Sequence, residues 1–227
     1  MKTKTNKQRY LKQLYASILL ALSDLPEGAG PQSEQAEPTE QGAGRMEQGA
    51  GFRAREAESQ LQEAVRLKVQ GNGRYREGRY RDAIGQYHRA LLLLRGLDPD
   101  VTTPMESFGA ARVTLNPQQE EMLRGTQVDC YNNLAACLLR RQPVCFARVR
   151  EYSVKALQWQ PGSVKALYRA GVATLELGDP ETALQYLSQA SRGQPNDPNV
   201  KKHIEIAEER MSKNLQKEKA LYRGMFN

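Results

Sequence analysis

Residues typical of β-sheets are scarce in this sequence. It contains four Phe and one Trp among 227 residues, and it has few runs of β-branched residues. Because strands favour aromatic and β-branched side chains, the composition predicts helices and argues against a sheet-rich fold. The hydrophobic fraction of 39% is sufficient for a helical core, and the length allows one ordinary domain with a tail.

Cysteine is also rare, and its placement argues against a disulfide framework or a zinc site. There are three cysteines, an odd number, and none forms a C-x-x-C pair. Cys130 and Cys137 are seven residues apart, which places them on one face of a helix. We expect them to be small buried hydrophobes in a protein of a reducing compartment, and this predicts a cytoplasmic location.

Motifs for catalysis and for cofactor binding are missing. The two histidines, His88 and His203, lie far apart and belong to no H-E-x-x-H or Cys/His metal pattern. No serine stands in a nucleophile-elbow context, and no glycine-rich phosphate loop follows a strand pattern. We therefore predict a protein that is not an enzyme and that needs no cofactor or metal.

The excess of positive charge is concentrated at the N-terminus. The formal net charge is +7, but five basic residues precede the first acid, Asp24. Those five are Lys2, Lys4, Lys7, Arg9 and Lys12. Subtracting them leaves +2 for the rest of the chain, whose mixed charges are typical of a solvated helical surface rather than of a nucleic-acid-binding stripe.

The same N-terminal region carries a short apolar run, Leu14–Leu22. This run is too short to cross a bilayer, so no stable membrane insertion is expected. Residues 26–51 are rich in Gly, Pro, Gln and Glu and contain the motif E/Q-G-A-G three times. Such a composition buries too little apolar surface to fold. We predict a basic, largely disordered extension over residues 1–52, with order beginning near Arg53.

An internal repeat dominates the rest of the chain. Small residues recur at a separation of 100 residues in four pairs: Gly71 with Gly171, Gly78 with Gly178, Ala83 with Ala183 and Ala90 with Ala190. Pro161 and Pro195, at the ends of two successive units, are 34 residues apart. Small residues let paired helices approach closely, and aromatic residues such as Tyr87 fill the space between them. These features are typical of tetratricopeptide repeats, which are helix-turn-helix units.

We predict an all-α tetratricopeptide repeat solenoid of three such repeats over residues 53–198, at about 61–95, 118–161 and 162–195. A proline- and glycine-rich loop is expected at 96–117, with Asn116 and Pro117 opening the next helix. The middle repeat is the least regular, with about two extra residues near Pro143. A charged C-terminal helix at 199–227 would cover the apolar face of the last repeat.

Polar residues on the first helix of each repeat are the candidates for binding, because these helices line the concave groove of stacked repeats. Lys68 and Asn72 are four residues apart in repeat one, so they share a helix face. Lys165 and Arg169 have the same spacing in repeat three, and Asn133 stands on the first helix of repeat two. Donors that converge from different helices suit a ligand with two carboxylates, and the Asn amides add direction.

The segments around these residues, KVQGN, YNNLAAC and KALYR, resemble the dicarboxylate clamp of co-chaperone tetratricopeptide domains. The resemblance implies that Lys68, Asn72 and Asn133 hold the terminal carboxylate of a chaperone tail ending in Glu-Glu-Val-Asp. It also implies that Lys165 and Arg169 reach the acidic side chains of that tail. The expected partners are C-terminal tails of cytosolic chaperones of the heat shock protein 90 or 70 families, and the expected function is that of a co-chaperone-like adaptor.

A wider resemblance, from about Leu61 to Phe226, is to the repeat domain of the large FK506-binding immunophilins, with no prolyl-isomerase domain before it. The segments DCYNNLAACLL and RVREYSVKAL resemble the tetratricopeptide repeat protein 9 family, in particular its short member C. The long N-terminal extension departs from that member, so residues 1–52 carry no functional expectation.

Two other functions stay open at this point. Lys and Arg on helix surfaces are often only solvated. In that case the chain would be a structural scaffold that uses its convex face or its C-terminal helix. The basic N-terminal tail would instead suit association with membranes or nucleic acid.

Overall fold

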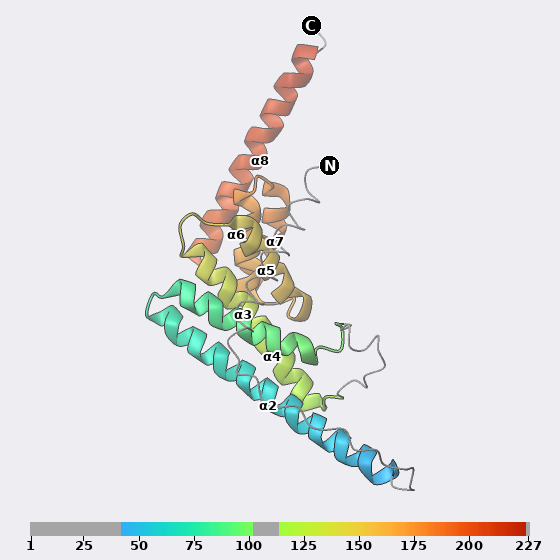
Figure 1. The fold of residues 1–227 in the computed structure, drawn as a ribbon. Helices are drawn as coiled ribbons and strands as arrows, with labels where there is room; N and C mark the ends of the chain where they lie inside the picture. The colour runs from blue at the N-terminus through green and yellow to red at the C-terminus, as the bar shows by residue number, and fades with distance from the viewer. Residues whose placement is uncertain (1–41, 102–113, 226–227) are drawn as a thin grey trace. The chain divides into compact units, whose positions relative to one another are not determined.

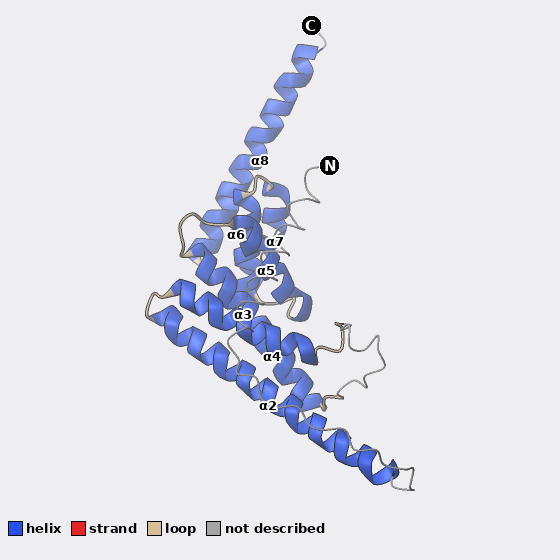
Figure 2. Ribbon diagram, in the orientation of Figure 1, coloured by secondary structure: helices blue, strands red, loops and turns tan. Residues whose placement is uncertain are grey.

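The computed structural model describes residues 42–101 and 114–225, and every regular element in those ranges is a helix (Figures 1 and 2). The helices are α2 (Gly42–Arg76), α3 (Tyr80–Leu97), α4 (Pro117–Leu139), α5 (Phe146–Trp159), α6 (Val164–Glu176), α7 (Pro180–Gly193) and α8 (Pro198–Met225). Helices α4 and α5 pack together, as do α6 and α7, and α8 contacts both α6 and α7. This order matches the predicted three repeats and C-terminal helix.

Two glycines allow the paired helices of repeats one and three to approach closely. A Cβ atom added at Gly71 of α2 would lie 2.6 Å from Cε1 of Tyr87 on α3. One added at Gly171 of α6 would lie 2.6 Å from Cγ of Leu187 on α7. Both distances are well inside the optimal separation of carbon atoms. The glycine that recurs at a separation of 100 residues, Gly71 and Gly171, is therefore needed for close packing in both repeats.

The turn that follows each of these first helices also uses glycine. Gly78 and Gly178 have φ values of 75° and 90°, a left-handed conformation that only glycine adopts without strain. In the first turn, the backbone N–H of Arg79 donates to the carbonyl of Arg74 at 2.9 Å. The helix thus ends on a satisfied carbonyl, and the chain reverses within residues 77–79.

Helix α4 begins where the sequence predicts. The side chain of Asn116 accepts a hydrogen bond from the backbone N–H of Gln119 at 2.9 Å, and the side chain of Gln119 accepts one from the backbone N–H of Asn116 at 3.0 Å. Pro117 occupies the first helical position. This reciprocal capping box satisfies donors that the first turn of a helix leaves free.

The structure differs from the prediction at the start of the repeat domain. Helix α2 begins at Gly42, upstream of the start expected near Arg53. The core holds this helix through buried residues from Ala57 to Leu67. A helix that has nucleated adds residues without a second nucleation cost, so α2 continues upstream of the core although residues 42–51 include four glycines. The rest of the predicted extension, residues 1–41, lies outside the described residues, as does part of the predicted loop, 102–113.

The middle repeat has the longest internal connection. Residues 140–145 join α4 to α5, whereas residues 77–79 and 177–179 make the equivalent turns of the other repeats. The irregularity predicted near Pro143 falls in this connection. Among the described residues, no helix combines the length and apolar character needed to cross a membrane.

Candidate peptide-binding site

Helices α2 and α4 are joined by polar side-chain contacts at one fixed offset along the chain. In each contact, the residue on α4 follows its partner on α2 by 61 positions. The contacts join Gln119 Nε2 to Glu58 Oε2 at 2.6 Å, Lys68 Nζ to Asp129 Oδ2 at 2.9 Å, and Asn133 Nδ2 to Asn72 Oδ1 at 2.9 Å. Three of the residues predicted for the site, Lys68, Asn72 and Asn133, therefore lie along one α2–α4 seam.

Asn72 lies at the centre of this group. Its Oδ1 accepts hydrogen bonds from Asn133 Nδ2 and from the hydroxyl of Tyr87 at 2.8 Å. Tyr87 is 1% exposed, so α3 fixes the orientation of Asn72 from inside the core. Because both bonds end on Oδ1, the amide nitrogen of Asn72 takes part in neither and is oriented as a donor.

Lys68 is paired with a carboxylate that the sequence analysis did not single out. Its ammonium contacts Asp129, and the side chain of Lys68 is 18% exposed whereas that of Asp129 is 56% exposed. Asp129 precedes Asn133 by four residues on α4, so the two share a helix face. Only the register between α2 and α4 places Asp129 opposite Lys68, and sequence spacing alone does not give that register.

Arg169 connects α6 to α4. Its Nη1 donates to Oδ1 of Asn132 at 3.5 Å, a long contact. Asn132 and Asn133 are consecutive, so one asparagine of this pair contacts α6 and the other contacts α2. Burial lowers the pKa of Arg169 below its usual value, although the group stays charged in the physiological range.

Lys165 lies on the same side of the fold as Arg169. The two residues help to line a cavity of about 240 Å³, together with Tyr75 of α2 and Tyr168 of α6. Lys165 itself is exposed. The structure therefore places the five predicted residues in two groups, one on the α2–α4 seam and one at this cavity, and the adjacent asparagines of α4 join the groups.

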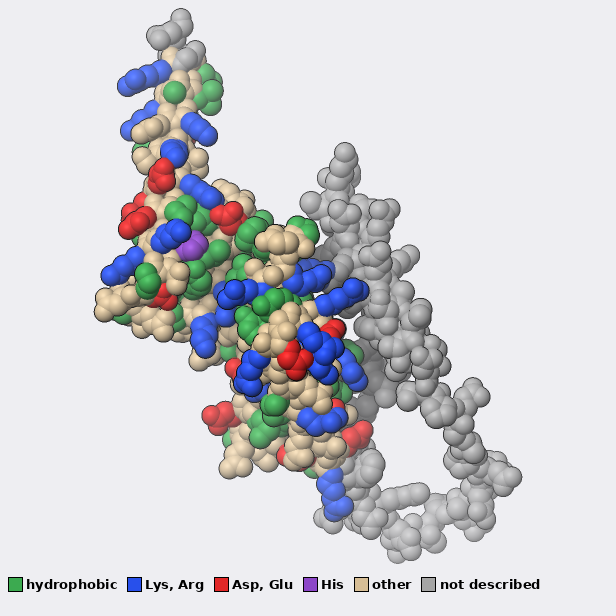
Figure 3. All heavy atoms as spheres, turned by 90° about the vertical axis from the view of Figure 1, so that its left-hand side faces the viewer, with side chains coloured by type: hydrophobic (Ala, Val, Ile, Leu, Met, Phe, Trp, Pro, Cys, Tyr) green, Lys and Arg blue, Asp and Glu red, His purple; other side chains and the backbone are tan. Residues whose placement is uncertain are grey.

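Positive charge gathers around the cavity. Arg140 lines it beside Lys165 and Arg169, and the acidic residue of the lining is Asp197. Figure 3 views the side of the molecule where the α2–α3 and α4–α5 turns lie, and Lys and Arg side chains gather over that region. The exposed arginines of these turns include Arg76 and Arg141. Such a surface attracts acidic ligands.

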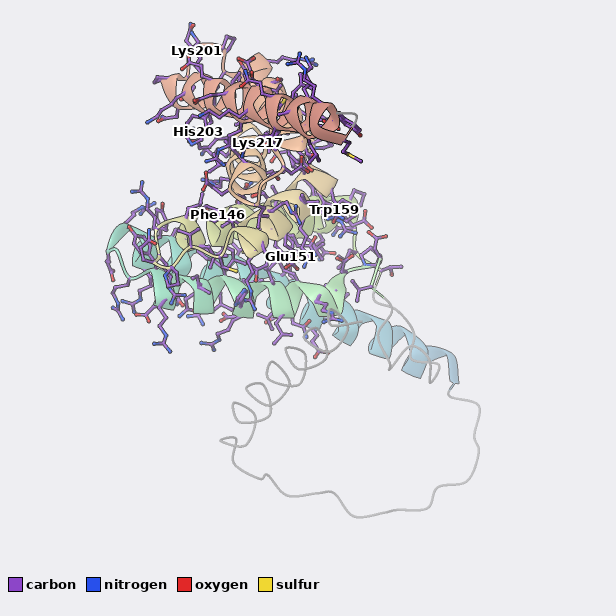
Figure 4. All side chains as sticks on the ribbon, turned by 90° about the horizontal axis from the view of Figure 1, so that it is seen from above. Phe146, Glu151, Trp159, Lys201, His203 and Lys217 are labelled. Carbon is purple, nitrogen blue, oxygen red and sulfur yellow. The ribbon has the colours of Figure 1, made fainter. Side chains whose placement is uncertain are left out.

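Trp159 stands at the end of α5 (Figure 4) and is 43% exposed. The guanidinium of Arg124 lies over its ring, 3.6 Å from the ring centre. Arg124 also contacts Asp98 at 2.9 Å and Asp100 at 2.6 Å. Trp159 thus belongs to a cluster that ties the end of α3 to α4, because the arginine offers both a ring-stacking face and a charged fork.

Two of the cysteines behave as predicted. Cys130 and Cys137 are fully buried, and burial raises the pKa of each thiol to about 12. Cys145 is exposed. No group of three His, Cys, Asp or Glu side chains that could hold a metal ion occurs within residues 42–101 and 114–225. His88 instead lies 3.1 Å from the hydroxyl of Tyr152.

Comparison with known proteins identifies relatives of the chain, although no family model matches it. It is 47% identical over 166 residues to tetratricopeptide repeat protein 9C of Xenopus tropicalis, and the match covers 73% of this chain and 93% of that protein. It is also 26% identical over 170 residues to the human peptidyl-prolyl cis-trans isomerase FKBP4, but this match spans only 33% of the isomerase.

Solved structures show the same fold. The C-terminal tetratricopeptide-containing domain of a Plasmodium falciparum FK506-binding protein matches with a TM-score of 0.59 at 22% identity, over 70% of this chain and 95% of that one. UNC-45 from C. elegans, in complex with an Hsp90 peptide, matches with a TM-score of 0.52 at 23% identity, over 70% and 15%. The Hsp90 co-chaperone Cns1 from Saccharomyces cerevisiae matches with a TM-score of 0.51 at 22% identity, over 73% and 45%.

These matches and the seven described helices confirm the predicted fold, which is three tetratricopeptide repeats followed by a capping helix. Domains of this class present a concave surface to other proteins. Because the chain is 47% identical to the Xenopus tropicalis protein over 93% of that protein's length, it belongs to the tetratricopeptide repeat protein 9C family.

Proposed function

We propose that this protein is an adaptor that binds acidic C-terminal peptides in the groove formed by α2, α4 and α6. The observation that carries the proposal is the contact between Asn72 and Asn133. It holds two amides in a fixed orientation across α2 and α4, and Lys68 stands one helical turn before Asn72 on α2. A fixed set of donors around one point is what recognition of a carboxylate requires.

The two groups of the site suit two carboxylates. Lys68, Asn72 and Asn133 would hold the terminal carboxylate, since an ammonium and an oriented amide supply charge and direction. Lys165 and Arg169 would hold an acidic side chain at the cavity. Arg169 is partly removed from solvent, so its interaction with an anion is screened less than that of an exposed arginine.

Chaperone tails are the ligands that the comparisons favour. One structural neighbour is a complex with an Hsp90 peptide, and another is an Hsp90 co-chaperone. The clamp resemblance points the same way, toward tails of the heat shock protein 90 or 70 families that end in Glu-Glu-Val-Asp. The role proposed is that of a co-chaperone-like adaptor in the cytoplasm, which binds without catalysing a reaction.

A matched pair of charge reversals tests the proposal. Lys165→Glu reverses an exposed charge at the cavity, and Lys217→Glu reverses an exposed charge on α8 beyond the residues that line it (Figure 4). Fluorescence anisotropy with a labelled peptide ending in Glu-Glu-Val-Asp should show micromolar affinity for the full chain, about −7 to −8 kcal/mol. We expect Lys165→Glu to weaken binding at least about tenfold and Lys217→Glu to leave it nearly unchanged. Equal effects of the two variants would argue for general electrostatic attraction and against the clamp.

A scaffold function is the second candidate, and α8 supplies the observation in its favour. Val200 and Ala207 of α8 are buried in the fold, and the helix continues to Met225. Further along α8, Leu221 and Tyr222 are 65% and 54% exposed. A partner protein could cover this apolar surface. Partner capture that Tyr222→Glu abolishes and Lys165→Glu spares would support the scaffold, and the opposite pattern would support the adaptor.

A further inference from the structure

The carboxylate-binding group contains a carboxylate of its own. Asp129 Oδ2 lies 2.9 Å from Lys68 Nζ, at the place where a ligand carboxylate would have to approach the same ammonium. Asp129 also stands one helical turn before Asn133, so it shares the face of α4 that contributes to the site. The predicted donors are thus partly occupied before any ligand arrives.

We propose that Asp129 competes within the molecule for the terminal carboxylate of the ligand. The proposal rests on the adaptor function proposed above. Asp129 makes the groove depend less on the terminal carboxylate and more on the acidic side chain that Lys165 and Arg169 would hold. The free terminus of the peptide then contributes less to binding than it would without Asp129, and acidic side chains near the C-terminus contribute a larger share.

The chemistry of Lys68 supports competition rather than complete blockade. An ammonium has three donors, so Lys68 can contact Asp129 and still donate to a second carboxylate. Two carboxylates on one ammonium lie close enough to repel each other, and this lowers the affinity for the second. The side chain of Asp129 is 56% exposed, so it can turn into solvent at small cost when a ligand binds.

The second group of the site has a different arrangement. Arg169 contacts the neutral amide of Asn132, and Lys165 and Arg169 share their cavity with Arg140 and with one acid, Asp197. Asp129 is absent from the lining of that cavity. The positive charge that faces an acidic side chain there is therefore not offset by Asp129, and the two halves of the groove should respond differently when this aspartate is changed.

Asp129→Asn tests the proposal because it removes the charge and keeps the shape. The dissociation constants of two labelled peptides are measured, one ending in Glu-Glu-Val-Asp as the free acid and the other as its C-terminal amide. We expect Asp129→Asn to raise the preference for the free acid over the amide by about three- to fivefold, the size of an exposed ion-pair effect. Asp129→Glu keeps the charge and should show the preference of the wild type.

Glu121→Gln is the matched control. Glu121 is an exposed acid on the same helix, eight residues earlier and roughly 12 Å along α4. The substitution removes one negative charge from the chain, so any change in the affinity of this variant for the peptides reports general electrostatic attraction. The preference for the free acid over the amide should stay constant. Thermal unfolding of each variant shows that it is folded before its affinities are compared.

The outcomes separate the two proposals. An unchanged or smaller free-acid preference in Asp129→Asn would overturn competition and would make Asp129 a residue that orients Lys68. If the wild type still prefers the free acid in that case, the adaptor function stands. Binding that appears only in Asp129→Asn would support the competition in its strongest form. Failure of both proteins to bind either peptide would contradict the adaptor function and, with it, the role of Asp129.

Discussion

Repeats one and three have the same packing frame but different groove surfaces. Gly71 and Gly171 occupy equivalent places, and each faces the side chain that follows it by 16 residues, Tyr87 or Leu187. In repeat one, however, the hydroxyl of Tyr87 donates a hydrogen bond to the side chain of Asn72. Leu187 packs in the core with Leu175 and Ala207 and has no polar group to offer.

The groove-facing residues do not follow the interval of 100 residues. The equivalents of Lys68 and Asn72 in repeat three are Tyr168 and Val172. Lys165 and Arg169 instead stand three residues earlier in the frame, about one helical turn away from those equivalents. Close helix pairing requires small residues at the same positions in both repeats, whereas the positions that face the groove differ. Binding groups should therefore be sought where the repeat pattern breaks.

The largest effect should come from filling the two glycine contacts. Gly71→Ala and Gly171→Ala would each push against a packed side chain, and overpacking of this kind costs about 1–3 kcal/mol in the free energy of unfolding. Only Gly71→Ala should also weaken peptide binding, because it displaces Tyr87 from Asn72. Urea unfolding and peptide anisotropy measure the two effects.

Gly85→Ala is the control for these substitutions. A Cβ at Gly85 would meet no atom within 4 Å, and the residue lies within α3. Alanine there should raise stability by up to about 1 kcal/mol, since glycine is a poor helix former. Loss of peptide binding to the same extent in Gly71→Ala and Gly171→Ala would contradict the proposed difference between the repeats.

A smaller effect is expected when the polar link of repeat one is removed. Tyr87→Phe deletes the hydroxyl that donates to Asn72 at 2.8 Å, which should lower the free energy of unfolding by about 0.5–1.5 kcal/mol. It should also weaken peptide binding a few-fold, because Asn72 loses one of its two orienting bonds. Tyr186→Phe in repeat three is the control, since the hydroxyl of Tyr186 makes no hydrogen bond to the described part of the chain. Comparable losses in both variants would rule out a special role for the link.

The smallest effect concerns acid sensitivity. Burial lowers the pKa of His88 below its ordinary value of 6.5, and Arg148 and Lys155 lower it further. In the pH range below 6.5 the unfolded chain therefore binds a proton that the folded chain does not. The contribution of His88 to the free energy of unfolding should fall as the pH decreases through that range.

His88→Ser tests this sign, because Ser188 stands at the equivalent position of repeat three. Urea unfolding of the wild type and the variant is compared between about pH 7 and pH 5.5, where the histidine titrates. The wild type should lose more free energy of unfolding than the variant does when the pH is lowered. A constant difference would show that His88 takes up its proton equally in both states.

Much of the fold could be predicted because its determinants are local. The glycines and alanines of the repeats lie at fixed separations, and the turns at Gly78 and Gly178 need the left-handed conformation that the sequence allows. The start of α4 follows from Asn116 and Pro117 through a capping box. Such signals act within a few residues of the chain, so spacing and residue type are enough to find them.

The contacts of the site depend on more than local sequence. Spacing predicts that Lys68 and Asn72 share a face, but the partner of Lys68 follows from the register between α2 and α4. Asp129 therefore escaped the prediction, although it stands only two residues before the YNNLAAC segment, which begins at Tyr131. The contact between Trp159 and Arg124 likewise depends on how α5 ends against α4. The roles of the five site residues stay predictions.

Calorimetric titration of the full chain with a peptide ending in Glu-Glu-Val-Asp, beside the same titration of Asn72→Ala, tests whether the Asn72–Asn133 pair helps to bind the peptide. Asn72 accepts from both Tyr87 and Asn133, so its removal disrupts the carboxylate-binding group while Lys165 and Arg169 are retained. We expect one site per chain with micromolar affinity for the wild type, and at least about tenfold weaker binding for Asn72→Ala. Equal affinity of the two proteins, or no binding to the wild type, would contradict it.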